Sequence, residues 1–368
     1  MKYIENLLKG AEVKWMPLGE MAEIGTGSSN RQDEVENGEF PFYVRSKNIL
    51  RSATYQFDET AIVIPGEGGI GDIYHFVKGK YALHQRAYRV HLHNNKLLDK
   101  YVFHYMGACF KEYIISKSVG ATATSIRKPM LEKFLIPIPP LAVQEEIVRI
   151  LDKFTTLEAE LEAELDCRKR QYEYYRNQLL SFDMLTRGGQ KLNNVEYKAL
   201  SEVAEIRRGK RLVKSELSTS GNYAVYQNSM IPLGYYSKSN VSEGTTFVIS
   251  AGSAGEIGYS PNRFWAADDV YYFIFNDGVC SKYVYYFLLI KQQSIKRQVR
   301  RASVPRLSKT AFEKLKIPIP PLAEQHRIVS ILDKFDALTT SISEGLPKEI
   351  ALRRKQYEYY RNQLLSFA

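Results

Sequence analysis

The sequence predicts an α+β protein of two tandem domains, each followed by a long helix. The stretch Gln171–Phe182 returns unchanged at Gln356–Phe367, and Ile136–Ala142 returns at Ile317–Ala323. The repeat offset is 181 residues for the second pair and 185 for the first, a period of domain size rather than of a solenoid. An apolar stripe at helical spacing runs through both copies.

The first domain, expected over residues 1–137, shows strand-like runs separated by glycine. Ile62–Pro65 precedes a glycine-rich turn, and Tyr81–His91 is an alternating run that contains aromatic residues. A helix is expected from Asp99 to about residue 115. Runs rich in Tyr, Val and Ile that end at glycines indicate a twisted, largely antiparallel sheet, with this helix packed on it.

The first long helix is expected within residues 138–183. Pro139 and Pro140 favour an extended segment, after which the helix begins. From Leu141 to Phe182 there are 42 residues, which as a helix would span roughly 60 Å at about 1.5 Å per residue.

The second domain (184–318) and second helix (319–368) repeat this plan. Val195–Ile206 aligns with Val13–Ile24, whereas the loops between the shared strands differ almost completely. The second helix carries four extra residues around Ser343–Lys348. Pro347 after Gly345 predicts a kink or short break there.

Neither long helix has a core of its own, so each stripe needs a partner. We expect the two helices to pair as an antiparallel, coiled-coil-like spacer with pseudo-two-fold symmetry. The alternative is that each stripe packs on its own domain.

The chain has a formal net charge of +10, most of it in the second half. Residues 12–137 hold 16 basic against 14 acidic side chains, and residues 190–318 hold 19 against 10. The excess forms one cluster at 207–214 and another at 296–309, a charge pattern typical of nucleic-acid binding. A solvated basic face is the alternative for either cluster.

No catalytic constellation is visible in the sequence. The glycine-rich turns at 66–71 and 252–258 lack the Gly-Lys-Ser/Thr of a P-loop, and the histidines have no metal-ligand spacing. Asp268 and Asp269 have no obvious catalytic partner nearby. Three distant cysteines and the lack of a membrane span or signal peptide suit a cytoplasmic protein.

The whole chain resembles the specificity subunits of type I restriction-modification systems. The resemblance rests on the Ile-Pro-Ile-Pro-Pro-Leu-Ala segment, on Ile-Leu-Asp-Lys-Phe at 150–154 and 331–335, and on the ending Gln-Tyr-Glu-Tyr-Tyr-Arg-Asn-Gln-Leu-Leu-Ser-Phe. It implies a non-catalytic subunit whose two target recognition domains read the halves of a bipartite, asymmetric DNA site.

The resemblance also implies partners. Two copies of the modification (methyltransferase) subunit would attach, and restriction-translocation subunits would join them. S-adenosylmethionine, ATP and Mg would belong to those partners, with no cofactor or metal in this chain. A self-contained nuclease or methyltransferase, and a helical scaffold that does not bind DNA, remain the alternatives.

We expect DNA contacts from basic and amide side chains in the variable loops. The candidates are Arg31, Arg45, Lys47, Asn48, Arg51, Gln85, Arg86, Arg127, Lys128, Arg207, Arg208, Lys210, Arg211, Gln227, Asn228, Lys296, Arg297, Arg300, Arg301 and Arg306.

Partner contacts are expected from exposed positions of the repeated helix ending. The candidates are Glu173, Tyr174, Arg176, Asn177, Glu358, Tyr359, Arg361 and Asn362.

Overall fold

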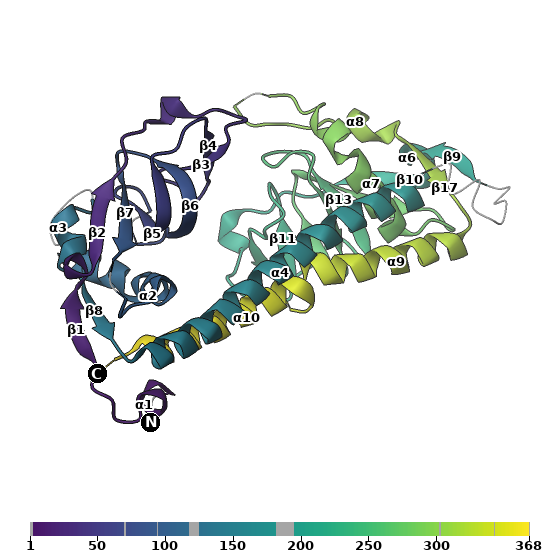
Figure 1. The fold of residues 1–368 in the computed structure, drawn as a ribbon. Helices are drawn as coiled ribbons and strands as arrows, with labels where there is room; N and C mark the ends of the chain where they lie inside the picture. Colours follow the sequence, from purple (N-terminus) through teal and green to yellow (C-terminus); the bar gives the residue numbers. More distant parts are fainter. Residues whose placement is uncertain are drawn as a thin grey trace. The chain divides into compact units, whose positions relative to one another are not determined.

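The computed structural model describes residues 3–69, 71–93, 95–117, 125–181, 195–301, 303–341 and 343–367, without the side chain of Lys214 (Figure 1). The chain divides into two compact units: unit 1 is Met1–Glu162 with Ile350–Ala368, and unit 2 is Ala163–Glu349. Each unit holds one domain and part of the long helices. The sequence predicts two domains and two long helices as four separate segments. In the structure, parts of each helix pack on a domain core and are counted with that domain.

Unit 1 is built on a six-stranded sheet. The strand order is β2 (Ala22–Thr26), β7 (Ala87–Leu92), β5 (Phe57–Pro65), β6 (His75–Leu83), β3 (Phe40–Tyr43), β4 (Leu50–Ser52). All neighbours are antiparallel except β3 and β6, which confirms the largely antiparallel sheet. Helix α2 (Asp99–Lys117) buries Val102, Met106 and Phe110 in a core shared with Ile62 and Val90. The remaining short elements are α1 (Tyr3–Leu8), β1 (Lys14–Pro17), η1 (Leu18–Glu20), η2 (Arg31–Asp33), α3 (Lys128–Glu132) and β8 (Leu135–Ile138).

Unit 2 repeats this topology with one strand interrupted. One sheet has the order β10 (Ala204–Arg208), β16 (Val270–Phe275), β13 (Thr245–Ile249), β14 (Ile257–Ser260), and a second has β12 (Gly234–Tyr236), β11 (Tyr223–Tyr226), β15 (Phe264–Ala266). β14 pairs with β13 as β6 pairs with β5, and β15 runs parallel to β11 as β6 does to β3. Together they take the place of β6. Pro261 lies between them and has no N–H for the ladder, which accounts for the interruption.

The other elements of unit 2 also have counterparts in unit 1. They are β9 (Glu196–Ala199), α6 (Leu200–Val203), η3 (Lys214–Glu216), α7 (Ser281–Lys296), α8 (Thr310–Glu313) and β17 (Lys316–Ile319). The repeated Ile-Pro-Ile segments form β8 and β17, which pair with β1 and β9 in the same register: Lys14 faces Ile138 and Glu196 faces Ile319.

The first long helix, α4, is continuous from Leu141 to Leu179. The second is broken, as expected, into α9 (Leu322–Thr340) and α10 (Gly345–Leu365). Gly345 has a φ of +76°, and a Cβ at this position would lie 2.5 Å from the carbonyl oxygen of Ala337. Only glycine fits this turn without strain. Two residues that we expected in the apolar stripe, Phe182 and Ile342, lie outside the described residues.

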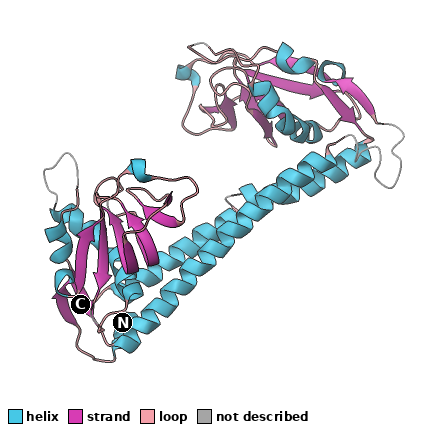
Figure 2. Cartoon of the chain, turned by 45° about the horizontal axis from the view of Figure 1, so that its top comes forward, coloured by secondary structure: helices cyan, strands magenta, loops and turns pink. Residues whose placement is uncertain are grey.

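The apolar stripe serves both of the roles considered for it. Near the start of each helix it packs on the adjacent domain: Ile147 and Leu151 join the core of unit 1, and Ile328 and Leu332 join that of unit 2. Farther along, α4 lies beside the second helix in each unit (Figure 2), and aromatic residues of the stripe stack between them.

In unit 1, Phe154 of α4 stacks on Tyr360 of α10 at 5.3 Å, and Glu158 accepts a hydrogen bond from Arg354. Because these contacts run in opposite directions along the two helices, the pair is antiparallel. In unit 2, Phe335 of α9 stacks on Tyr175 of α4 at 5.6 Å. Phe335 and Tyr175 are the repeat counterparts of Phe154 and Tyr360, so the same ring pair is made twice.

Candidate nucleic-acid interface

Backbone hydrogen bonds gather four connections of unit 1 at one end of its sheet. Gln85 N donates to Ser29 O at 2.9 Å, and His84 N donates to Tyr43 O at 3.0 Å. Gly66 N donates to Arg86 O at 2.9 Å. We call this end, formed by residues 27–30, 44–48, 66–69 and 84–87, the loop edge of unit 1.

A polar network covers the loop edge of unit 1. Arg45 and Arg86 each donate to Oε2 of Glu67, at 3.1 and 3.0 Å. These contacts, chiefly the hydrogen bond from Arg86, lower the pKa of the Glu67 carboxyl group. Gln85 Nε2 donates to Asn30 Oδ1 at 2.5 Å. The donor-bearing side chains are thus held in place while remaining exposed.

Unit 2 has an equivalent edge. Lys210 N donates to Ala266 O, and Ser253 N donates to Asn228 O, both at 2.9 Å. Gly252, with a φ of +74°, packs so closely that a Cβ there would lie 2.7 Å from Asn228 O. We call residues 209–211, 227–230, 250–255 and 267–270 the loop edge of unit 2.

The second basic cluster joins this edge. Leu307 N donates to Ser250 O at 2.8 Å, and Arg300 and Arg306 exchange backbone hydrogen bonds at 2.9 and 3.2 Å. Arg208 reaches the same edge, where its Nε donates to Asp268 O at 2.5 Å. Two clusters that are about 90 residues apart in the sequence therefore converge on one surface.

Most of the expected DNA-binding side chains lie on or beside the loop edges. These are Arg31, Arg45, Lys47, Asn48, Gln85, Arg86 and Arg127 in unit 1 and Arg208, Lys210, Arg211, Gln227, Asn228, Arg300, Arg301 and Arg306 in unit 2. Their role in binding DNA remains a prediction.

Five expected residues are engaged differently. Arg51 donates to the carbonyls of Gly38 and Glu39 and so ties down the β3–β4 hairpin. Arg297 is the C-cap of α7. The other three form ion pairs: Lys128 with Glu132, Arg207 with Glu205 and Lys296 with Glu256.

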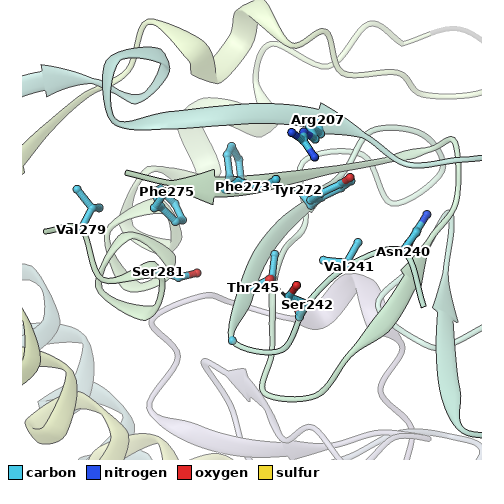
Figure 3. A pocket seen from close by; sticks show the side chains of 12 residues that line it. Arg207, Asn240, Val241, Ser242, Thr245, Tyr272, Phe273, Phe275, Val279 and Ser281 are labelled. Atoms are coloured by element: carbon cyan, nitrogen blue, oxygen red, sulfur yellow. Dashed lines mark hydrogen bonds between the residues drawn. The ribbon is translucent and has the colours of Figure 1, made fainter. Parts of the chain in front are cut away.

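Arg207 also lines a hollow of about 400 Å³ in unit 2. Figure 3 shows Arg207 beside Tyr272 at one end and Val279 with Ser281 at the other. The hydrogen bonds of Arg207 to both oxygens of Glu205, each 2.7 Å long, lower the pKa of that carboxyl group. The described lining provides hydroxyl groups, one amide and the guanidinium group of Arg207, but no carboxylate, histidine or cysteine.

The repeated helix ending presents matching tyrosines in the two units. Tyr174 is 60% exposed and Tyr359 is 61% exposed. Glu173, Asn177, Glu358 and Asn362 are exposed as well.

The expectation that Arg176 and Arg361 are exposed is wrong in part. Both are half-buried, with the guanidinium groups over the rings of Tyr172 and Tyr357 at 5.2 and 5.6 Å. The Nε atom of each is out of solvent and has no hydrogen-bond partner among the described residues. The stripe tyrosines draw these arginines onto the helix surface through cation–π contact.

Three acidic residues at the loop edges were not expected from the sequence, where basic side chains were the signal. Glu67 holds two arginines, and Asp268 and Asp269 form the turn next to Arg208. The sequence feature that could have identified them was an acidic side chain inside a basic, glycine-rich loop.

Among the described residues no group of three His, Cys, Asp or Glu side chains could hold a metal ion. No helix in the described part of the chain is long and apolar enough to cross a membrane.

Comparison with known proteins places these features in a family. The family model for the type I restriction modification DNA specificity domain matches residues 11–166 and again residues 193–352. A putative type I restriction enzyme specificity subunit of Haemophilus influenzae is 33% identical over 399 residues, covering 100% of this chain and 98% of the relative. A type I restriction enzyme specificity subunit of Escherichia coli is 32% identical and covers 100% and 97%.

Solved structures agree on the fold. The type I restriction-modification S subunit from M. genitalium superposes with a TM-score of 0.69 at 19% identity, covering 98% of this chain and 97% of that one. A chain from a study of complex assembly in a type I restriction-modification system gives 0.57 at 16% identity, covering 96% and 98%. The chain therefore belongs to the type I restriction-modification specificity subunits and carries their DNA specificity domain twice.

Proposed function

We propose that this chain reads a bipartite, asymmetric DNA sequence, with one half-site bound at the loop edge of each unit. The observation that carries the proposal is the repetition of one edge geometry with different side chains. Two domains that recognise different DNA sequences need the same backbone scaffold but different loop side chains, and the two loop edges have this combination. Arginine guanidinium groups and glutamine or asparagine amides can form hydrogen bonds with base edges, while the other basic side chains contact phosphates.

The helix ending supports docking of two methyltransferase subunits. Its sequence is identical in the two copies, and Tyr174 and Tyr359 are exposed to the same extent. Equivalent surfaces bind equivalent partners, and exposed tyrosines are frequent anchors of protein interfaces. Restriction-translocation subunits would then join through that complex. The α4–α10 and α4–α9 seams would form the pseudo-two-fold spacer between the half-sites.

In this proposal the chain itself is non-catalytic and cytoplasmic, and needs no cofactor. S-adenosylmethionine, ATP and Mg would be bound by the partner subunits. The name of the Escherichia coli relative, a specificity subunit of a restriction enzyme, supports this division of labour.

Methylation mapping after a domain exchange tests the proposal. Residues 184–318 would be replaced by the corresponding segment of a relative, in cells that supply the methyltransferase and restriction subunits. We expect one half-site to change and the other to stay. A simultaneous change in both would refute the assignment of one half-site to each domain.

Two alternatives predict other results. A helical scaffold would show no shift of mixed-sequence DNA in a gel. A self-contained nuclease or methyltransferase would modify DNA without any added subunit.

A further inference from the structure

The turn that leads into β7 in unit 1 and into β16 in unit 2 is the same structural element in both units. In unit 1 it is His84–Ala87, between β6 and β7, with a hydrogen bond from Ala87 N to His84 O of 2.9 Å. In unit 2 it is Ala267–Val270, between β15 and β16, with a hydrogen bond from Val270 N to Ala267 O of 3.1 Å. We refer to them as turn 84–87 and turn 267–270.

The neighbours of the two turns match as well. The first turn residue donates its N–H to the last residue of the adjacent strand: His84 to Tyr43 O at 3.0 Å, and Ala267 to Tyr226 O at 2.9 Å. The third turn residue accepts a hydrogen bond from the loop that follows β5 or β13: Arg86 O from Gly66 N, and Asp269 O from Ser250 N. Each turn therefore sits at the centre of its loop edge, held by the same backbone bonds.

The two central side chains have opposite hydrogen-bonding character in the two turns. Turn 84–87 presents Gln85 and Arg86, both exposed and rich in N–H donors. Turn 267–270 carries Asp268 and Asp269, which are both half-buried and as carboxylates only accept hydrogen bonds. The two turns therefore share a backbone but exchange hydrogen-bond donors for acceptors. This combination is expected where each domain recognises a different chemical group.

Phosphate binding does not explain the acidic turn. Two carboxylates among the arginines of the second loop edge repel the DNA backbone, and they lower non-specific affinity. They also do not serve only to hold Arg208, which donates to the backbone oxygen of Asp268 and lies 4.0 Å from the carboxylate of Asp269. Asp268 Oδ1 is out of solvent and has no hydrogen-bond partner among the described residues. A desolvated carboxylate oxygen without a donor is costly.

We propose that these turns determine base specificity in the two half-sites, an inference that rests on the function proposed above. Gln85 and Arg86 donate to acceptors on purine edges in one half-site. Asp268 and Asp269 accept a hydrogen bond from an exocyclic amino group in the other, cytosine N4 or adenine N6 in the major groove. Glu67 is a positioning residue, because it fixes Arg86 and Arg45 before DNA arrives.

The test is a selection from randomised DNA duplexes by the full chain in complex with methyltransferase subunits. The variant carries Asp268→Asn and Asp269→Asn, which keep the side-chain shapes. The control carries Glu243→Gln and Asp277→Asn, two exposed residues that precede β13 and follow β16 at the ends away from the loop edge. Both proteins lose two negative charges from unit 2, so general electrostatic effects are matched.

We expect the variant to lose discrimination at one or two adjacent base pairs of one half-site, by about 5- to 150-fold at each, which is the usual cost of one mismatched base pair. The other half-site should be unchanged, and it reports that the protein is folded. The control should select the wild-type sequence. Duplexes that replace the amino group of cytosine or of adenine with hydrogen at the affected position identify which base is read.

The selection distinguishes a failure of the proposed function from a failure of the role assigned to the turns. A wild-type protein that selects no sequence would refute the proposed function itself. A variant that selects the wild-type sequence, or one that alters both half-sites, would leave the proposed function standing and overturn the role of the turns.

Discussion

Two glutamines with the same contacts join domain to helix in the two units. Gln144 Oε1 accepts from Leu98 N at 2.9 Å, and its Nε2 donates to the carbonyls of Lys96 and Pro139. Gln325 repeats all three bonds with Cys280, Gly278 and Pro320. Both side chains are completely buried, so the bonds have no replacement from water. Each glutamine fixes the start of a long helix against the segment that leads into α2 or α7.

Gln144→Ala and Gln325→Ala should therefore destabilise their own units. Each change leaves buried backbone groups unpaired, and we expect a loss of about 2–4 kcal/mol in the free energy of unfolding. Gln178→Ala, at an exposed helix position, should change it by less than about 0.5 kcal/mol. Urea unfolding measures all three. Equal stability of the Gln144 and Gln178 variants would contradict the structural role.

A second residue pair predicts a pH dependence confined to unit 1. His104 Nε2 lies 2.8 Å from Asp152 Oδ1, whereas Tyr286, at the repeat position in unit 2, donates to Asp333. Burial is the largest influence on His104 and lowers its pKa in the folded state, against an opposing effect of Asp152. The unfolded value is about 6.5. Below this pH the unfolded chain binds more protons, so the stability contributed by neutral His104 falls as the pH falls.

The variant His104→Tyr should remove this dependence, since tyrosine already fits at position 286 with the same kind of partner. Melting temperatures of the variant and the wild type should diverge between pH 7.5 and pH 5.5, with the variant losing less. His75 and His84 also have pKa values lowered by burial, and they remain in both proteins, so the difference isolates His104. Parallel pH profiles would rule out this contribution.

At the scale of elements, the loop edges depend on connections that lie far apart in the sequence. Arg300, Arg301 and Arg306 adjoin the glycine loop at 250–255 through the bond from Leu307 to Ser250. Replacing the three arginines with Ala should flatten the salt dependence of DNA binding by about 0.9 in the log–log slope for each phosphate that is no longer neutralised. Arg51→Ala is the control, since Arg51 holds a hairpin through backbone carbonyls. An unchanged slope in the triple variant would mean that this segment faces away from DNA.

The break between α9 and α10 yields a stability prediction. Gly345→Ala forces a side chain into a left-handed conformation and against the carbonyl of Ala337. We expect a loss of about 1–3 kcal/mol in the free energy of unfolding. Gly107→Ala, where no atom lies within 4 Å of the new Cβ, should instead be neutral or slightly stabilising. If both variants were equally stable, the turn at 345 would not require glycine.

The repeat explains why the elements could be predicted from the sequence and the details of the site could not. Two copies of each scaffold segment mark the same strands and helices, and Pro347 with Gly345 marked the break. The closeness of Glu67 to Arg86, or of Asp268 to Arg208, depends on sheet order and turn geometry. The spacing of apolar residues along the sequence determines neither the sheet order nor the turn geometry. The rotation that folds Arg176 onto Tyr172 also depends on side-chain packing that spacing alone does not determine.

At the scale of the whole molecule, the long helices connect the two units, since α4 has about half of its length in each and α10 has only its first turn in unit 2. Helix α4 begins in unit 1 and ends in unit 2 without interruption. Within it, Glu158–Leu161 is followed at once by Glu162–Leu165 with the same sequence, Glu-Ala-Glu-Leu. Four residues add about 6 Å of rise and slightly more than one helical turn, so the apolar stripe stays nearly in phase with one copy or two. The length of the spacer can therefore change without loss of its packing face.

Deleting Glu162–Leu165 should preserve folding and partner binding and shorten the gap between the half-sites. Base pairs stack at about 3.4 Å, so about 6 Å corresponds to one or two base pairs. The deletion also removes one of two carboxylates that bind Arg354, while Glu158 remains. Glu162→Gln is the matched control, because it weakens the same ion pair at unchanged length. Methylation mapping should show a shorter gap with the same bases at each end for the deletion, and the wild-type site for the control. An unaltered gap in the deletion variant would mean that the helices do not set the spacing, and altered bases would mean that the domains do not read DNA independently of it.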